Sequence, residues 1–205
     1  MRRGKKMAIA GVGLLLLTCL CVGVGLRIYS VNEHSLSVPV ERYGIGENIN
    51  LEGAFITSSK EKTQGYSIVV NGVRMLSHGD YLERYGKGNG AAGDEKTILE
   101  IEVSIRNEGN SQGYLDVNGW RVVPERGNEY FVVNNSLWQL GEPNAPGETG
   151  GLSLVPDSEY TVSIPFVRNT GDEDMFAEGI GDTTFSLVVS DAPVRKEVAF
   201  CTDGQ

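Results

Sequence analysis

The feature that most restricts the fold of this chain is an uncharged run of twenty residues, Met7 to Leu26. A helix of that length spans roughly 30 Å at about 1.5 Å per residue, which matches the hydrocarbon core of a bilayer. A helix is the structure expected in lipid because it satisfies its backbone polar groups internally. The sequence therefore predicts a basic segment over residues 1–6 and one transmembrane helix over residues 7–26.

The charges that flank this run predict its orientation. One cation, Arg27, follows the run, whereas Arg2, Arg3, Lys5 and Lys6 precede it. An excess of cations marks the cytoplasmic side, so we expect a cytoplasmic N-terminus and an extracytoplasmic C-terminal domain. The chain is then a single-pass protein of a cell membrane.

Two other fates of the N-terminal segment compete with an uncleaved anchor. Gly23 and Gly25 have the spacing that a signal peptidase accepts, so cleavage after Gly25 would give a secreted protein. The residues Leu16 to Cys19 resemble the lipobox of bacterial lipoproteins, although Thr18 replaces the expected Gly, Ala or Ser. All three alternatives place the rest of the chain outside a cytoplasmic membrane.

The charge of the remaining chain restricts its partners. Five of the 18 Lys and Arg residues lie in residues 2–27, and all 27 acidic residues come later, so residues 28–205 carry a net charge of −14. Such a surface repels phosphate backbones, which excludes nucleic acid as the expected partner. Cys201 is the single cysteine of residues 28–205, so no disulfide can form within them. We expect Cys201 to be half-buried, on the face opposite Phe200.

The exported part divides into a stalk and a domain. Residues 27–46 contain few apolar repeats and carry Ser, Pro and Gly residues typical of an extended connection. Residues 47–205 have the size of one globular domain. We therefore place the domain boundary at residue 47.

The domain is patterned as strands. In Ile98–Arg106, Leu99, Ile101, Val103 and Ile105 alternate with polar residues, which is the pattern of a half-buried strand. Similar patterns predict further strands around Tyr66–Val73, Leu115–Val117, Val162–Phe166, Phe185–Val189 and Val194–Phe200, and a hairpin over Trp120–Val133.

Three residue types refine this prediction. Asn71-Gly72 favours a hairpin or a bulge, and Pro165 predicts an edge strand or a bulge because proline donates no hydrogen bond. Trp120 is the expected centre of the core because of its area. About seven short strands with frequent turns predict an all-β, antiparallel β-sandwich.

Three segments carry a resemblance to a known class of domain. Ile98–Asn110 resembles a strand and asparagine turn of immunoglobulin-like domains in bacterial envelope proteins, Trp120–Phe131 resembles the following hairpin, and Leu154–Val167 resembles a later turn and strand. The class consists of exported bacterial immunoglobulin-like domains of unknown function, and its fold is similar to that of a small secreted immunogenic antigen. The resemblance implies an immunoglobulin-like fold and brings no catalytic residues.

Residues capable of catalysis are scarce. The two histidines are His34, in the stalk, and His78, in a stretch that we expect to be a solvated loop. No G-x-S-x-G motif and no zinc-ligand spacing occurs. The glycine-rich stretch Gly86–Gly90 lacks a strand-to-helix context, so we interpret it as a surface loop. We expect no enzyme and no cofactor.

An acidic stretch is the nearest feature to a metal site. Several close carboxylates can bind calcium, which takes six to eight oxygen ligands, although the EF-hand spacing fails at Phe176. A solvated acidic loop is the alternative. The candidate calcium ligands are Asp172, Asp174, Glu178 and Asp182.

These observations favour an interaction module over the alternatives. Loops and strand edges of a sandwich can bind a peptide, a glycan or another envelope protein. The alternatives are a structural envelope domain stabilised by calcium, and a hydrolase that uses a pair of carboxylates.

Overall fold

The computed structural model describes residues 20–27, 38–87, 97–125, 130–145, 151–169 and 183–202. The chain divides into two compact units, Met1–Ser37 and Val38–Gln205. In the first unit, residues 20–27 are helical and expose apolar side chains such as Leu20 and Leu26. Within the described ranges, no helix has the length and apolar character needed to cross a membrane. Residues 1–19 lie outside these ranges, so the transmembrane helix over residues 7–26 stays a prediction.

The second unit is built mostly of strands, as predicted. The described residues form one nine-stranded sheet in the order β1-β11-β10-β6-β7-β9-β4-β3-β2 and a two-stranded sheet, β5-β8. The strands are β1 (Val40–Tyr43), β2 (Asn48–Asn50), β3 (Tyr66–Leu76), β4 (Ile98–Asn107), β5 (Leu115–Asp116), β6 (Arg121–Pro124), β7 (Phe131–Val133), β8 (Gly151–Leu152), β9 (Ser158–Arg168), β10 (Thr184–Ser190) and β11 (Arg195–Cys201).

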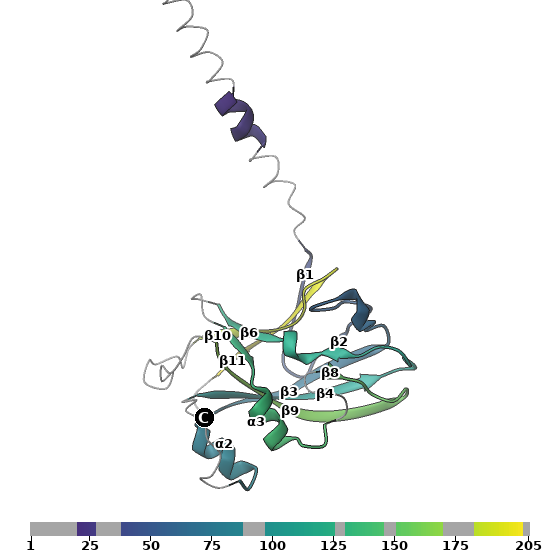
Figure 1. Cartoon of the computed structure of the whole chain (residues 1–205), viewed down its shortest axis with the longest axis vertical. Coiled ribbons are helices and arrows are strands. Elements are labelled where there is room, and N and C mark those ends of the chain that lie inside the picture. Colours follow the sequence, from purple (N-terminus) through teal and green to yellow (C-terminus); the bar gives the residue numbers. More distant parts are fainter. Residues whose placement is uncertain are drawn as a thin grey trace, which may run out of the picture. The chain divides into compact units, whose positions relative to one another are not determined.

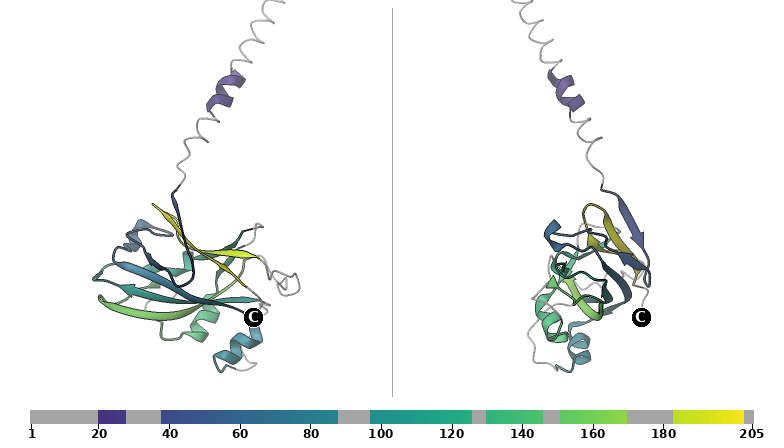
Figure 2. Two further views of the ribbon diagram at one scale, coloured as in Figure 1. Left: turned by 180° about the vertical axis from the view of Figure 1, so that it is seen from behind. Right: turned by 90° about the vertical axis from the view of Figure 1, so that its right-hand side faces the viewer.

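The large sheet folds over itself into a sandwich, with β3, β4 and β9 in one layer and β6, β10 and β11 in the other (Figures 1 and 2). Ile68 and Ile101 from the first layer meet Leu187 and Val198 from the second in one buried core. Trp120, directly before β6, is 1% exposed and belongs to this core, which confirms its predicted position.

The described residues of this unit also form short helices: α2 (His78–Arg84), α3 (Asn135–Gly141) and two 3-10 turns, Ser59–Glu61 and Val117–Gly119. The expectation of a loop at His78 is therefore wrong. The side chain of Ser77 accepts a hydrogen bond from the Asp80 backbone N–H and caps the first turn of α2. The predicted strand at Leu115–Val117 is also shorter than expected, because it ends at Asp116.

The stretch Asn71-Gly72 forms a bulge, one of its two predicted forms. β3 is continuous from Tyr66 to Leu76, and its register against β4 shifts between Val70 and Gly72. The predicted hairpin after Trp120 is confirmed by the antiparallel pairing of β6 with β7.

Of the two forms predicted at Pro165, the bulge is absent, whereas the edge strand is present in part, because β7 pairs only with Phe166–Arg168 at the end of β9. In the sheet order, β9 lies between β7 and β4, and the register with β4 runs through Glu100–Pro165 without a shift. The sheet tolerates a proline at this position because β7 ends at Val133. The Pro165 carbonyl accepts a hydrogen bond from Asn134 N–H, directly beyond β7, so the missing N–H of Pro165 falls where the ladder ends.

The first strand of the domain, β1, also differs from expectation. β1 lies inside the predicted stalk, yet it pairs with β11 from Val40–Arg195 to Tyr43–Val198. This pairing is parallel, so the sandwich is not antiparallel throughout. The compact unit accordingly begins at Val38, ahead of the expected boundary at residue 47.

Candidate functional site: the outer face of β4 and β9

Several predicted site residues lie outside the described ranges. They are His34 and the four candidate calcium ligands Asp172, Asp174, Glu178 and Asp182. In the described part of the chain, no three His, Cys, Asp or Glu side chains gather as a metal site. The calcium site therefore stays a prediction, and melting curves with calcium and with chelator would test it.

The structure also describes Cys201 and the start of the glycine-rich stretch. Cys201 lies opposite the buried Phe200 as expected, but it is exposed and not half-buried. Its Sγ lies 3.6 Å from Thr184 Oγ1. Gly86 and Lys87 follow α2, whereas residues 88–90 of the glycine-rich stretch lie outside the described ranges.

The structure brings together a charged cluster that the alternating pattern of β4 does not predict. Glu100 points to the outer face of β4 and is fully buried. Its carboxylate accepts hydrogen bonds from Tyr85 Oη at 2.6 Å and from Arg74 Nη1 at 3.1 Å, and Arg84 Nε lies at 3.3 Å. We call these four residues the Glu100 cluster.

The burial of Glu100 follows from α2 and α3. Tyr81 of α2, Ile98 of β4 and Leu137 of α3 form a second apolar cluster on the outer face of the sheet. Tyr81 Oη donates to the Leu137 carbonyl at 2.9 Å and ties the two helices together. A sequence signal for α2 existed, because Ser77-x-x-Asp80 ahead of Tyr81 and Leu82 is a helix-start pattern.

Together with Glu102, the Glu100 cluster is balanced in charge. Arg74 also lies 3.6 Å from Glu102, so two guanidinium groups face two carboxylates. Burial, reinforced by the hydrogen bond to Glu100, raises the pKa of Tyr85 to about 12, so its phenol stays a donor at neutral pH. This arrangement holds α2 against the sheet.

The other buried carboxylates are also matched by donors. Glu61 accepts from the backbone N–H groups of Ile56, Thr57 and Ser58 at 2.8–3.1 Å. Glu197 lies 2.7 Å from Arg42 and 3.2 Å from Arg195. Each of these buried carboxylates therefore has a structural partner among the described residues, and the carboxylate hydrolase stays an untested alternative.

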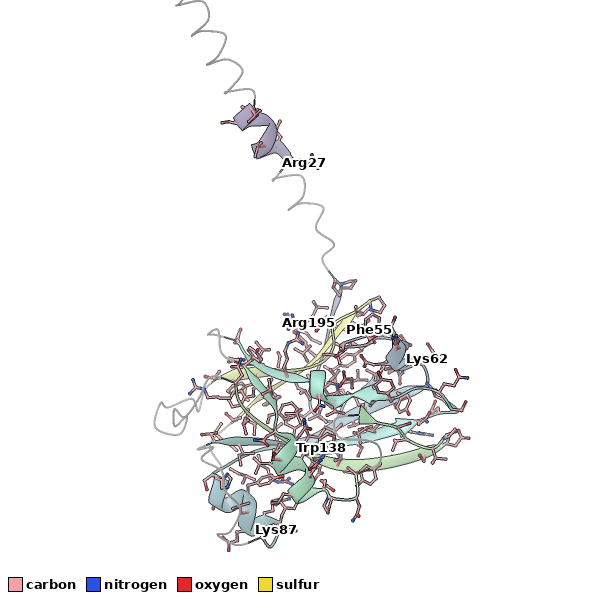
Figure 3. All side chains as sticks on the ribbon, in the orientation of Figure 1. Arg27, Phe55, Lys62, Lys87, Trp138 and Arg195 are labelled. Carbon is pink, nitrogen blue, oxygen red and sulfur yellow. The ribbon has the colours of Figure 1, made fainter. Side chains whose placement is uncertain are left out.

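Beside the cluster, one edge of β9 lacks a neighbouring strand. β7 pairs only with Phe166–Arg168, while β9 begins at Ser158. α3 fills part of the gap: Trp138 of α3 packs into the core, and Figure 3 shows this helix beside the sheet. The carboxylate of Glu142, at the end of α3, accepts from Ser163 N–H at 3.1 Å.

In the part of the chain that the structure describes, no strand or helix covers the rest of this edge. In an antiparallel strand, the N–H and C=O groups of alternate residues point to the same neighbour. Ser163 and Pro165 turn their backbone groups away from β4, so Glu159 and Thr161 do the same. Within the described residues, the outward backbone groups of Glu159 and Thr161 have no hydrogen-bond partner. We call these two residues the β9 open edge.

Comparison with known proteins identifies the domain. A family model described as a domain of unknown function, DUF5028, matches residues 40–196. The chain belongs to the DUF5028 family. The match begins at the first residue of β1 and ends within β11, so the DUF5028 region includes the strand β1, which lies within the predicted stalk.

Two solved structures are similar to this DUF5028 protein. The yjhA protein from Bacillus subtilis shares 16% identity over 76% of this chain and 97% of its own, with a TM-score of 0.40. An uncharacterized beta-sandwich protein from Clostridium difficile 630 shares 14% identity over 78% of this chain and 93% of its own, with a TM-score of 0.35. No curated protein matches the chain.

Proposed function

We propose that this protein is an extracytoplasmic binding module that lacks catalytic activity and is held at a bacterial cell membrane by its N-terminal apolar segment. The observation that carries the binding role is the β9 open edge. Unpaired backbone groups on a strand edge are a template for pairing with another chain. The surrounding sandwich is a rigid support for such an edge.

The membrane role rests on the N-terminal segment. The run from Met7 to Leu26 contains no charge, and its helical end over residues 20–27 exposes Leu20, Val22, Val24 and Leu26. Apolar side chains that are exposed all along a helix favour a lipid environment. The cations before the run favour a cytoplasmic N-terminus.

We further infer that the sandwich is immunoglobulin-like. The order β9-β4-β3 in one layer and β11-β10-β6-β7 in the other corresponds to strands E-B-A and G-F-C-C′ of a variable-type domain. Trp120, directly before β6, corresponds to the buried tryptophan of strand C. The pairing of β7 with β9 joins the two layers into one sheet.

Fractionation of cells that express the full chain tests the anchoring. We expect the chain to stay in the membrane after alkaline extraction, and protease added to spheroplasts to digest the domain. Leu16→Lys places a charge in the centre of the apolar run and should release the chain, whereas Val38→Lys, outside the run, should not. The mass of the mature protein separates an anchored chain from a cleaved or a lipidated one.

Chemical crosslinking of intact envelopes tests the binding role. We expect the wild-type chain to capture one reproducible partner. Capture of none across growth conditions, or recovery of the unprocessed chain from the cytosol, would contradict the proposed function.

A further inference from the structure

We propose that the β9 open edge binds an extended, basic peptide segment by strand addition. This inference rests on the proposed binding role and names its site and the chemistry of its partner. The added segment would lie beside Glu159 and Thr161 and continue the sheet beyond β9. Figures 1 and 2 show β9 as the outermost strand of its layer.

The available backbone groups determine the form of the ligand. Glu159 and Thr161 each offer one N–H and one C=O on the open side, at the spacing of two residues that an extended strand matches. A helix or a compact loop presents no such row, because its own backbone groups are already paired. The ligand is therefore an extended segment.

The protein limits how far such a segment can extend. At Ser163 the Glu142 carboxylate already occupies the N–H, and Pro165 has none. Because these positions cannot donate to an added strand, only a short stretch of β9 is available for pairing. The ladder is thus confined to the first half of β9.

The side chains at the edge determine the charge of the ligand. Glu159 is exposed and, in the described residues, forms no ion pair. Arg106, its cross-strand neighbour on β4, lies 3.3 Å from Glu108 instead. Asp157 is also exposed directly before the strand, and residues 28–205 carry a net charge of −14. A lysine or arginine opposite Glu159 complements this edge.

The test uses the full chain in lipid nanodiscs and a capped octapeptide of alternating Thr and Lys. We expect saturable binding at submillimolar concentration and slower amide exchange of Glu159 and Thr161. A peptide of equal charge with two central prolines controls for unspecific attraction to the acidic surface, and it should bind about tenfold more weakly, because each lost hydrogen bond contributes about 1 kcal/mol. A Thr-Glu octapeptide should not bind.

Two variants locate the site. Thr161→Pro removes the outward N–H without removing a bond to β4 and should lower the affinity about tenfold, whereas Thr161→Val keeps the N–H and should bind as the wild type does. Glu159→Lys should reverse the preference, so that the Thr-Glu peptide binds better. Glu159→Lys also serves as the deciding variant if Thr161→Pro fails to fold by circular dichroism.

The outcomes separate this inference from the proposed function. Equal binding of the proline-containing peptide, an unchanged preference in Glu159→Lys, or no saturation at about 1 mM would overturn the strand-addition site. If the folded Thr161→Pro variant still captures the envelope partner of the wild type, the binding role stands and the site is elsewhere. If no partner and no peptide bind, both proposals fail.

Discussion

Glu100 shows how one residue in an alternating strand can depart from its pattern. It occupies a polar position of β4, but α2 and α3 cover it, and Arg74 and Arg84 keep 36% and 42% of their side chains exposed while they contact its carboxylate. Such a network stabilises the fold while all its members are present, because removal of one partner leaves the others buried without their hydrogen bonds.

Glu100→Ala should therefore lower the free energy of unfolding by about 3 kcal/mol, because Arg84 and Tyr85 lose their shared acceptor. Urea unfolding followed by circular dichroism measures this change. Glu102→Ala is the matched control: it removes a single half-exposed contact to Arg74 at 3.6 Å and should cost less than about 1 kcal/mol. Equal costs would contradict the structural role of the Glu100 cluster.

Tyr85 links the same cluster to alkaline pH. Its pKa rises from 10.0 to about 12 in the folded chain, first through burial and then through the hydrogen bond to Glu100. The folded state therefore holds the phenol proton longer than the unfolded state does. This contribution to stability is complete below about pH 10 and is lost as the pH rises towards about 12. The urea midpoint should fall less steeply between about pH 9.5 and 11.5 in Tyr85→Phe than in the wild type, and equal slopes would refute this assignment.

At position 65, the backbone conformation and the available space require glycine. Its φ is +82°, and a Cβ there would lie 2.6 Å from the Glu108 carbonyl oxygen. Gly65→Ala should destabilise the domain by about 2 kcal/mol or more, as a shift of the thermal midpoint would show. Gly72→Ala is the control, because a Cβ at the β3 bulge meets no atom within 4 Å. A larger loss at Gly72 would contradict the prediction.

At the scale of elements, β1 is attached to β11 by charge as well as by its ladder. The buried Lys196 donates to Glu41 at 2.7 Å, and Arg42 donates to Glu197 at 2.7 Å. Figure 3 shows Arg195, at the start of β11, at the end of the sandwich that also holds Phe55. Phe55 bridges to Ala192, so this end is also tied across the layers.

Glu41→Ala leaves the Lys196 ammonium buried without its acceptor. We expect roughly tenfold faster hydrogen exchange of the β1 amides, which corresponds to about 1.4 kcal/mol, because bonds to charged groups contribute about that much. Glu47→Ala is the control, since this carboxylate bonds only to the nearby Gly44 N–H among the described residues. Unchanged exchange in Glu41→Ala would show that backbone pairing alone holds β1.

At the scale of the whole molecule, the boundary of the domain is the testable feature. A fragment that begins at Val38 should unfold cooperatively, because it retains β1 and the packing of Tyr43 against the core. A fragment that begins at Glu47 lacks both and should melt several degrees lower. Calorimetry of the two fragments measures this difference, and equal melting temperatures would assign residues 38–46 to a linker.

The sequence alone determined the strand class, the hairpin after Trp120 and the position of Trp120 in the core, because alternation and turn chemistry are local properties. It could not determine that Glu100 is buried, that β7 pairs with β9 only beyond Pro165 or that β1 joins β11. Each of these depends on which distant segment becomes a neighbour: α2 over Glu100, the end of β7 beside Pro165, and β11 beside Val40–Tyr43. The β9 open edge has the same origin. The backbone groups of Glu159 and Thr161 lack a partner because β7 is shorter than β9, and the length of a neighbouring strand is a property of the tertiary structure.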